Sequence, residues 1–174
     1  MKTIREQIIE RIIAQLETIT VGNGYSNDIG LGQVYRQESV LEKDQVPVAA
    51  VWELSETRER NRYGGTVRKL IIRVESRVGT KEGKHPAEVS NELLGDIEKA
   101  MIMGNVTLDE LIDDIQDISS EISGSPSNEE ELTSQSNRKF SSAAIEFEIV
   151  YTTEWGDPYT RQNLEPGWGK KVTD

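Results

Sequence analysis

The chain has 174 residues, of which 35% are hydrophobic and 29% are charged, and its formal net charge is −11. An acidic chain is a poor general binder of nucleic acid and of anionic membranes, because binding to either depends on neutralising negative charge. The absence of cysteine excludes disulfides, a thiol nucleophile and cysteine metal sites. No apolar run is long enough to span a bilayer, and charges interrupt any signal-peptide core, so we expect a cytoplasmic protein.

Residues 2–18 predict an amphipathic helix, because large aliphatic side chains recur at four-residue spacing. These side chains are Ile4, Ile8, Ile12 and Leu16. Thr3 and Glu6 resemble a capping box at the start of this helix. Residues 21–32 contain glycines but lack the Lys-Ser/Thr pair and the preceding strand of a nucleotide site, so they predict a loop. A short strand is predicted over residues 33–37.

Residues 48–56 and 66–78 predict an antiparallel pair of strands. In the second strand, Leu70, Ile72 and Val74 fall on one face. Charged side chains fall on the opposite face, namely Lys69, Arg73, Glu75 and Arg77. This period of two indicates a sheet with one buried and one solvated face. The connector, residues 57–65, contains an asparagine and two adjacent glycines that favour a turn.

A second helix is predicted from Pro86, which suits a first helical position, to residue 103, where Gly104 favours an ending. Thr107 and Glu110 resemble another capping box, which predicts a short helix over residues 107–112. Residues 113–122 fit either a helix or a strand, and the strand is favoured. Residues 123–137 are nearly free of apolar side chains and predict a polar, mobile loop.

The clearest half-buried strand is predicted over residues 141–151. Its apolar face carries Ala143, Ile145, Phe147, Ile149 and Tyr151. We expect this strand to join the earlier pair as a third partner, with the two long helices covering the sheet. The predicted fold class is therefore α+β, a mostly antiparallel sheet covered by two long helices. The expected organisation is one domain over residues 1–154, followed by a C-terminal extension over residues 155–174.

Few residues suggest chemistry. His85 is the only histidine, and its place beside Pro86 favours a capping or surface role over that of a catalytic base. Asp109, Asp113 and Asp117 are spaced to line one face of a continuous helix, where they could hold Mg²⁺ or Ca²⁺. The predicted helix ends inside this run, so solvated carboxylates are favoured. We therefore predict no catalytic, cofactor-binding or metal-binding residues.

Two groups of residues are candidates for protein contact. Arg58, Arg60 and Arg62 lie at alternate positions in the hairpin connector of an acidic protein. They suit a carboxylate-rich partner, although local pairing with nearby glutamates in a solvated loop is the favoured alternative. The C-terminal extension supplies aromatic side chains of the kind that anchor interfaces, namely Trp155, Tyr159 and Trp168.

The order of these elements resembles that of the tail terminator proteins of long-tailed bacteriophages, the group that includes the minor tail protein U of lambda-like phages. The resemblance covers residues 1–154. The matching segments, in chain order, are IREQIIERIIAQL, QVYRQ, VPVAAVWEL, KLIIRVESRV, SNELLGDIEKAM, LDELI and SSAAIEFEIVYTTE. The polar segment 123–137 and the region beyond Trp155 depart from the family pattern.

The resemblance implies a structural protein that is not an enzyme. Family members form a ring of six copies that caps the tail tube, ends its elongation and then offers its other face to the head–tail connector. The implied partners are copies of the chain itself, the tail tube protein and the connector protein, while DNA passes through without specific binding. The implied location is the host cytoplasm during assembly and then the virion tail.

Other readings of the residues remain open. Another head–tail joining or tail-completion protein would share a small α+β fold. A metal-dependent hydrolase would use the three aspartates, and a cytoplasmic binding module of unknown ligand is the remaining alternative.

Overall fold

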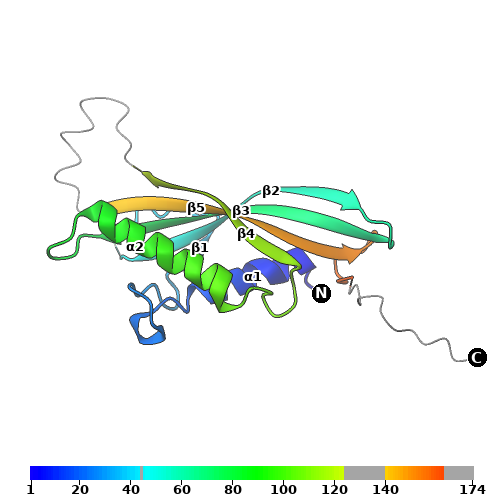
Figure 1. The fold of residues 1–174 in the computed structure, drawn as a ribbon, viewed down its shortest axis with the longest axis horizontal. Coiled ribbons are helices and arrows are strands. Elements are labelled where there is room, and N and C mark those ends of the chain that lie inside the picture. Colours follow the sequence, from blue (N-terminus) through cyan, green and yellow to red (C-terminus); the bar gives the residue numbers. More distant parts are fainter. Residues whose placement is uncertain (44, 124–139, 163–174) are drawn as a thin grey trace, which may run out of the picture.

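The computed structural model describes residues 1–43, 45–123 and 140–162 of the chain. Five strands form one sheet in the order β1-β2-β3-β5-β4, and two helices pack against it (Figure 1). The elements are α1 (Ile4–Leu16), a 3₁₀ turn (Val21–Asn23), β1 (Val34–Arg36), β2 (Val48–Arg60), β3 (Gly65–Gly79), α2 (Pro86–Lys99), a π-helical turn (Ala100–Gly104), β4 (Asp114–Ser123) and β5 (Phe140–Glu154). The predicted α+β class is confirmed.

Both helices begin at the predicted capping residues. The hydroxyl of Thr3 accepts the backbone N–H of Glu6 at 3.2 Å, which satisfies one amide left free at the start of α1. The Glu6 carboxylate completes no capping box, because it binds Arg36 instead. At α2, Nδ1 of His85 accepts the N–H of Ala87 at 3.2 Å. This contact confirms the capping role predicted for the single histidine.

The central sheet is antiparallel across β2, β3 and β5. Strand β5 pairs with β3 along its whole length, as predicted, and the register places Phe147 opposite Ile72 and Ile145 opposite Val74. The description as mostly antiparallel needs one correction, because β1 runs parallel to β2 and makes the sheet mixed. Strand β1 has only three residues, so its sequence carries no signal of direction.

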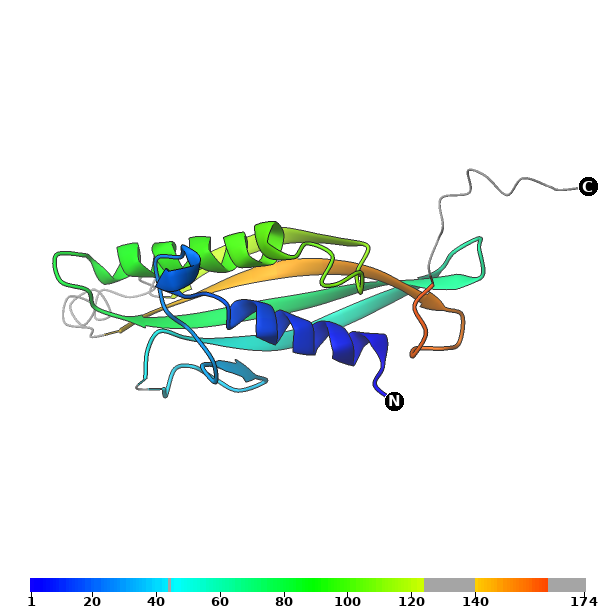
Figure 2. The same cartoon turned by 90° about the horizontal axis from the view of Figure 1, so that it is seen from below.

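The two helices cover the same face of the sheet. In Figure 2 both lie in front of the strands, with α2 over β5 and β3 and with α1 toward β2. Six of the fully buried side chains on this face are Ile8, Ile12, Leu70, Ile72, Leu93 and Phe147. Their burial supplies the main hydrophobic stabilisation, because each removes most of a large apolar side chain from water.

The opposite face is mostly polar. Arg73 at its centre forms ion pairs with Glu75, Glu121 and Glu146 on three strands. At one end, Val40 from the loop before β2 packs in a small second cluster with side chains of β2. The predicted division of β3 into a buried face and a charged face is thereby confirmed.

Two further boundaries differ from the predictions. Residues 57–60, predicted as connector, continue β2, so the turn is confined to residues 61–64. The helix predicted over residues 107–112 is wrong. Leu108, Asp109 and Glu110 have φ angles of 46°, 59° and 65°, which lie in the left-handed region and cannot continue a right-handed helix. The strand favoured for 113–122 is confirmed as β4.

Helix α1 has 13 residues and is shorter than the predicted segment 2–18. Helix α2 has 14 residues, and the π-helical turn continues it to Gly104, where the predicted helix ends. Within the described part of the chain, neither is long and apolar enough to cross a bilayer. The segment predicted as a polar loop, 123–137, lies outside the described residues except at its first position.

Alternate residues of β3 provide a test of the two faces. Ile72→Ala should lower the free energy of unfolding by about 2–5 kcal/mol, because the side chain is fully buried under the helices. Ile71→Ala is the matched control, since the same atoms are removed from the half-buried opposite face, and its cost should be less than half as large. Urea unfolding measures both. Equal costs would contradict the assignment of the faces.

Candidate functional site

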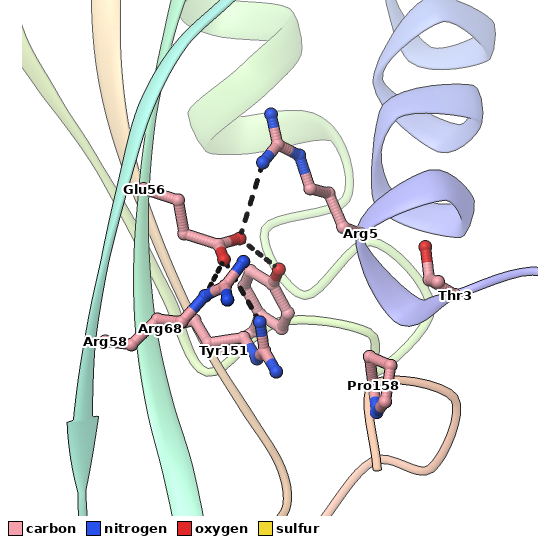
Figure 3. Close-up of a pocket in the computed structure, with 7 residues that line it drawn as sticks. All are labelled: Thr3, Arg5, Glu56, Arg58, Arg68, Tyr151 and Pro158. Carbon is pink, nitrogen blue, oxygen red and sulfur yellow. Dashed lines mark hydrogen bonds and ion pairs between the residues drawn. The ribbon is translucent and has the colours of Figure 1, made fainter. Parts of the chain in front are cut away.

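A cluster of charged side chains surrounds Glu56 on the helix-covered face of β2. The Glu56 side chain is only 3% exposed. Its Oε1 accepts hydrogen bonds from Nε of Arg58 at 2.6 Å and from Nη1 of Arg68 at 3.0 Å. Its Oε2 accepts the hydroxyl of Tyr151 at 2.5 Å and lies 3.9 Å from Nη1 of Arg5 (Figure 3). A single carboxylate thus faces three guanidinium groups.

The strand register explains why these side chains meet. Arg68 of β3 lies directly opposite Arg58 of β2 on one side and Tyr151 of β5 on the other. Like charges directly opposite each other repel across adjacent strands. Glu56 lies two residues from Arg58 on the same face of β2, where its carboxylate reaches both guanidinium groups. The glutamate therefore neutralises a repulsion that the register itself creates.

The cluster shifts the acidity of its members. Burial alone would raise the pKa of Glu56, but the Tyr151 hydroxyl and the neighbouring arginines outweigh it and hold this pKa below its ordinary value of 4.5. Burial and the hydrogen bond to Glu56 raise the pKa of the Tyr151 hydroxyl. At neutral pH the carboxylate is therefore charged and the tyrosine remains a hydrogen-bond donor.

A second set of ion pairs connects the cluster to α1 and β1. Nε of Arg5 donates to Glu53 at 3.0 Å, and Arg36 donates to the same carboxylate at 2.6 and 2.8 Å. Arg36 also binds both oxygens of Glu6, at 2.7 and 3.0 Å, and this contact lowers the pKa of Glu6. The first turn of α1 is thereby fixed to the edge of the sheet.

A small cavity of about 100 Å³ opens beside Glu56. Figure 3 shows how its walls come from the start of α1, from three adjacent strands and from the segment after β5. The lining residues are Thr3, Arg5, Glu56, Arg58, Arg68, Tyr151 and Pro158. The cavity can admit a small charged group, but it is far below the size of sites that enclose a nucleotide or a drug-sized molecule.

The predicted contact residues divide into two groups. The guanidinium of Arg60 stacks over Trp155 at 4.1 Å, and that of Arg62 lies 4.8 Å from the ring of Tyr63. Arg58 instead turns toward the cavity and pairs with Glu56. Arg58 is also exposed, over 60% of its side chain, but it does not join the cation–aromatic pairs of the hairpin tip.

Of the predicted aromatic anchors, Trp155 is 63% exposed and Tyr159 is 45% exposed. Trp168 lies outside the described residues.

The hairpin tip is held in place by the segment after β5. The side chain of Gln162 accepts from Asn61 at 2.9 Å and donates to the carbonyl of Tyr63 at 3.0 Å. Gly65 permits this approach, since a Cβ there would lie 2.0 Å from the Gln162 oxygen. The Arg60–Trp155 pair therefore lies beside a hairpin tip whose position is fixed by hydrogen bonds between the turn and the segment after β5.

The aspartates considered for metal binding are not brought together. Asp109 pairs with Arg11, while Asp113 binds Arg161 and the hydroxyl of Thr152. Within the residues that the structure describes, no group of three or more potential ligands from His, Asp and Glu is placed to hold a metal ion.

Sequence reasoning missed the cluster around Glu56. One signal was present, because Arg68 falls on the same face of its strand as the buried Leu70 and Ile72. A charged residue in that register requires a partner in the core. The identity of the partner depends on the register between β2 and β3. The alternation of apolar and polar residues within either strand does not specify that register.

Glu56→Gln should lower the free energy of unfolding by about 2–4 kcal/mol at pH 7, because it leaves the buried guanidinium of Arg68 without its carboxylate. The pKa of Glu56 is lowered on folding, so its charge stabilises the fold above the ordinary value of 4.5. That stabilisation disappears as the pH falls through the folded pKa. Urea unfolding across a pH series should therefore show that the free energies of unfolding of the original protein and of the variant become equal in acid.

The exposed Glu59 on the same strand provides the control for that experiment. Glu59→Gln should change the free energy of unfolding by no more than about 0.5 kcal/mol at any pH. A pH-independent cost for the Glu56 variant would show that lost packing, rather than lost charge, is responsible.

Comparisons with known proteins do not assign the chain to a family. No protein-family model matches it, and a search of curated proteins found no match.

Proposed function

We propose that this chain is a structural protein of bacteriophage assembly, a tail terminator that forms an oligomeric ring on the end of the tail tube. The ring stops further tube subunits from adding and then offers its other face to the head–tail connector. The chain is not an enzyme in this proposal. It acts in the host cytoplasm during assembly and remains in the virion tail.

The order of elements supports the proposal. An amphipathic helix, a short strand, a long hairpin, a second helix and, after β4, a closing strand occur in the order of the family that the sequence resembles. The short helix expected at residues 107–112 is the element of that order which is replaced by a left-handed turn. In this proposal residues 1–154 are the single domain, and the described part of the C-terminal extension, residues 155–162, lies at the hairpin end. Six copies in a ring would repeat the hairpin tip six times around one opening.

The single observation that carries the proposal is the exposed group of cations and aromatic rings at the hairpin end. Arg60 with Trp155 and Arg62 with Tyr63 form two stacked pairs, and both rings are more than half exposed. Arginine, tryptophan and tyrosine are the residue types that most often dominate the binding energy of protein interfaces. A tip held rigid before binding also loses little entropy when a partner docks.

The net charge of −11 is compatible with a ring through which DNA passes. An acidic lumen repels the phosphate backbone and limits adhesion of the DNA during transit. The exposed arginines at the tip would then meet carboxylates of a neighbouring copy, the tube protein or the connector.

Tube polymerisation separates a terminator from another head–tail joining protein. Purified chain added to polymerising tube protein should arrest elongation, and electron microscopy should show a ring at the tube end. A joining protein from the head side would leave tube length unchanged. Tubes that keep growing with the chain bound along their sides would refute a terminator role.

Arg60→Ser combined with Arg62→Ser should weaken ring formation or tube capping roughly tenfold, about 1.4 kcal/mol. The reason is the loss of two exposed guanidinium groups that would meet carboxylates of the partner, because each such exposed ion pair contributes about 0.2–1 kcal/mol. Native mass spectrometry across a concentration series measures the change. The fold should be retained, because both side chains are exposed.

A matched variant controls for net charge. Lys84→Ser combined with Lys99→Ser removes the same number of cations from the ends of α2, and it should leave assembly unchanged. Equal weakening by both double variants would assign the effect to overall charge rather than to the hairpin tip.

A further inference from the structure

We propose that the cavity beside Glu56 is a binding site for one carboxylate side chain, presented by an acidic segment of a protein partner. The inference does not depend on ring formation. It rests on the charges, the size and the accessibility of the cavity.

The cavity wall carries an excess of positive charge. Three guanidinium groups line it, from Arg5, Arg58 and Arg68, against the single carboxylate of Glu56. Arg5 is also paired with Glu53, which lies behind the wall rather than in the lining. An additional anion in this space would therefore be attracted by the local field in spite of the acidic chain around it.

Arg58 is the residue that distinguishes a binding site from a purely structural cluster. Arg68 is 10% exposed and holds the strands together through Glu56 and Thr153. The side chain of Arg58 is 60% exposed, so its ion pair with Glu56 contributes little to stability. In the described part of the chain, its only side-chain hydrogen bond is from Nε to Glu56. Its terminal nitrogens can therefore serve a second carboxylate.

The space and the charges favour a carboxylate over other anions. A cavity of about 100 Å³ accommodates a carboxyl group and the carbon that bears it, and it is well below the size of sites that enclose drug-sized ligands. The planar fork of arginine matches the two oxygens of a carboxylate. Glu56 at the wall disfavours a dianionic phosphate, and the net charge of −11 disfavours a polyanion such as DNA. These conditions together select an acidic side chain on a protein.

The direct test is a titration of the whole protein with an acetylated, amidated glycine–glutamate peptide. Nitrogen-15 labelling of arginine allows the Nε–Hε signal of each arginine to be followed by NMR. We expect a saturable shift of the Arg58 and Arg5 signals that exceeds the shift of Arg60 and Arg62. The corresponding glycine–glutamine peptide should produce no saturable shift.

Two variants with the same change of charge give the decisive comparison. Arg58→Gln should weaken binding of the glutamate peptide at least tenfold, whereas Arg60→Gln on the same strand should stay within twofold of the original protein. Arg58→Lys keeps the charge but loses the planar fork, so its affinity for the glutamate peptide should lie between those of the Arg58→Gln and Arg60→Gln variants. It also provides the comparison if the glutamine variant does not fold.

Three results would overturn the proposal. Equal shifts with the glutamine peptide would remove the role of the carboxylate. If the Arg58 and Arg60 variants weakened peptide binding equally, binding would be due to general electrostatic attraction by the hairpin and not to the cavity. Tighter binding of inorganic phosphate than of the glutamate peptide would make the cavity a phosphate site instead.

Discussion

The difference in length between the strands and the helices constrains this fold more than any single contact. Strand β3 has 15 residues and spans about 50 Å, whereas α2 has 14 residues and spans only about 21 Å. Two such helices cannot cover the sheet side by side, and they are staggered along it instead (Figure 2). The hairpin end of the sheet still extends past both helices. Side chains on the covered face must therefore change from apolar to polar along the same strand.

The cluster around Glu56 lies where this change occurs. Along β3 the covered face passes from Ile72 and Leu70 to Arg68. In the adjacent strands Arg58 and Tyr151 lie at the level of Arg68, and Glu56 lies one step back, opposite Leu70. A buried polar group needs a partner, because losing water without forming a hydrogen bond is costly. The ion pairs and the tyrosine satisfy that need at the margin of the apolar core. The same margin leaves a cavity open to solvent, so one arrangement accounts for both the stabilising contacts and the proposed site.

The elements that the sequence predicted well are those with strong internal periodicity. Alternation in β3 and β5 and the aliphatic stripe of α1 each follow from residues within one element, so one chain segment contains the whole signal. The parallel direction of β1 depends on the path of a loop rather than on its three residues. The helix predicted after Thr107 failed because its hydroxyl accepts the N–H of Glu110 in a left-handed turn as readily as in a helical cap. The site around Glu56 required the alignment of three strands, which no single segment encodes.

The shortness of β1 has a consequence for association between copies. It pairs only with residues 49–51 of β2, so within the described residues the remainder of β2 forms an outer edge. Exposed edges are templates for uncontrolled strand addition, and natural proteins guard them with charges and bulges. Here the edge carries Glu53, Arg58, Glu59 and Arg60, and the register with β3 shifts between Glu53 and Ser55. These features discourage growth of the sheet from chain to chain, so a partner that docks at this end would have to bind through side chains rather than by adding a strand.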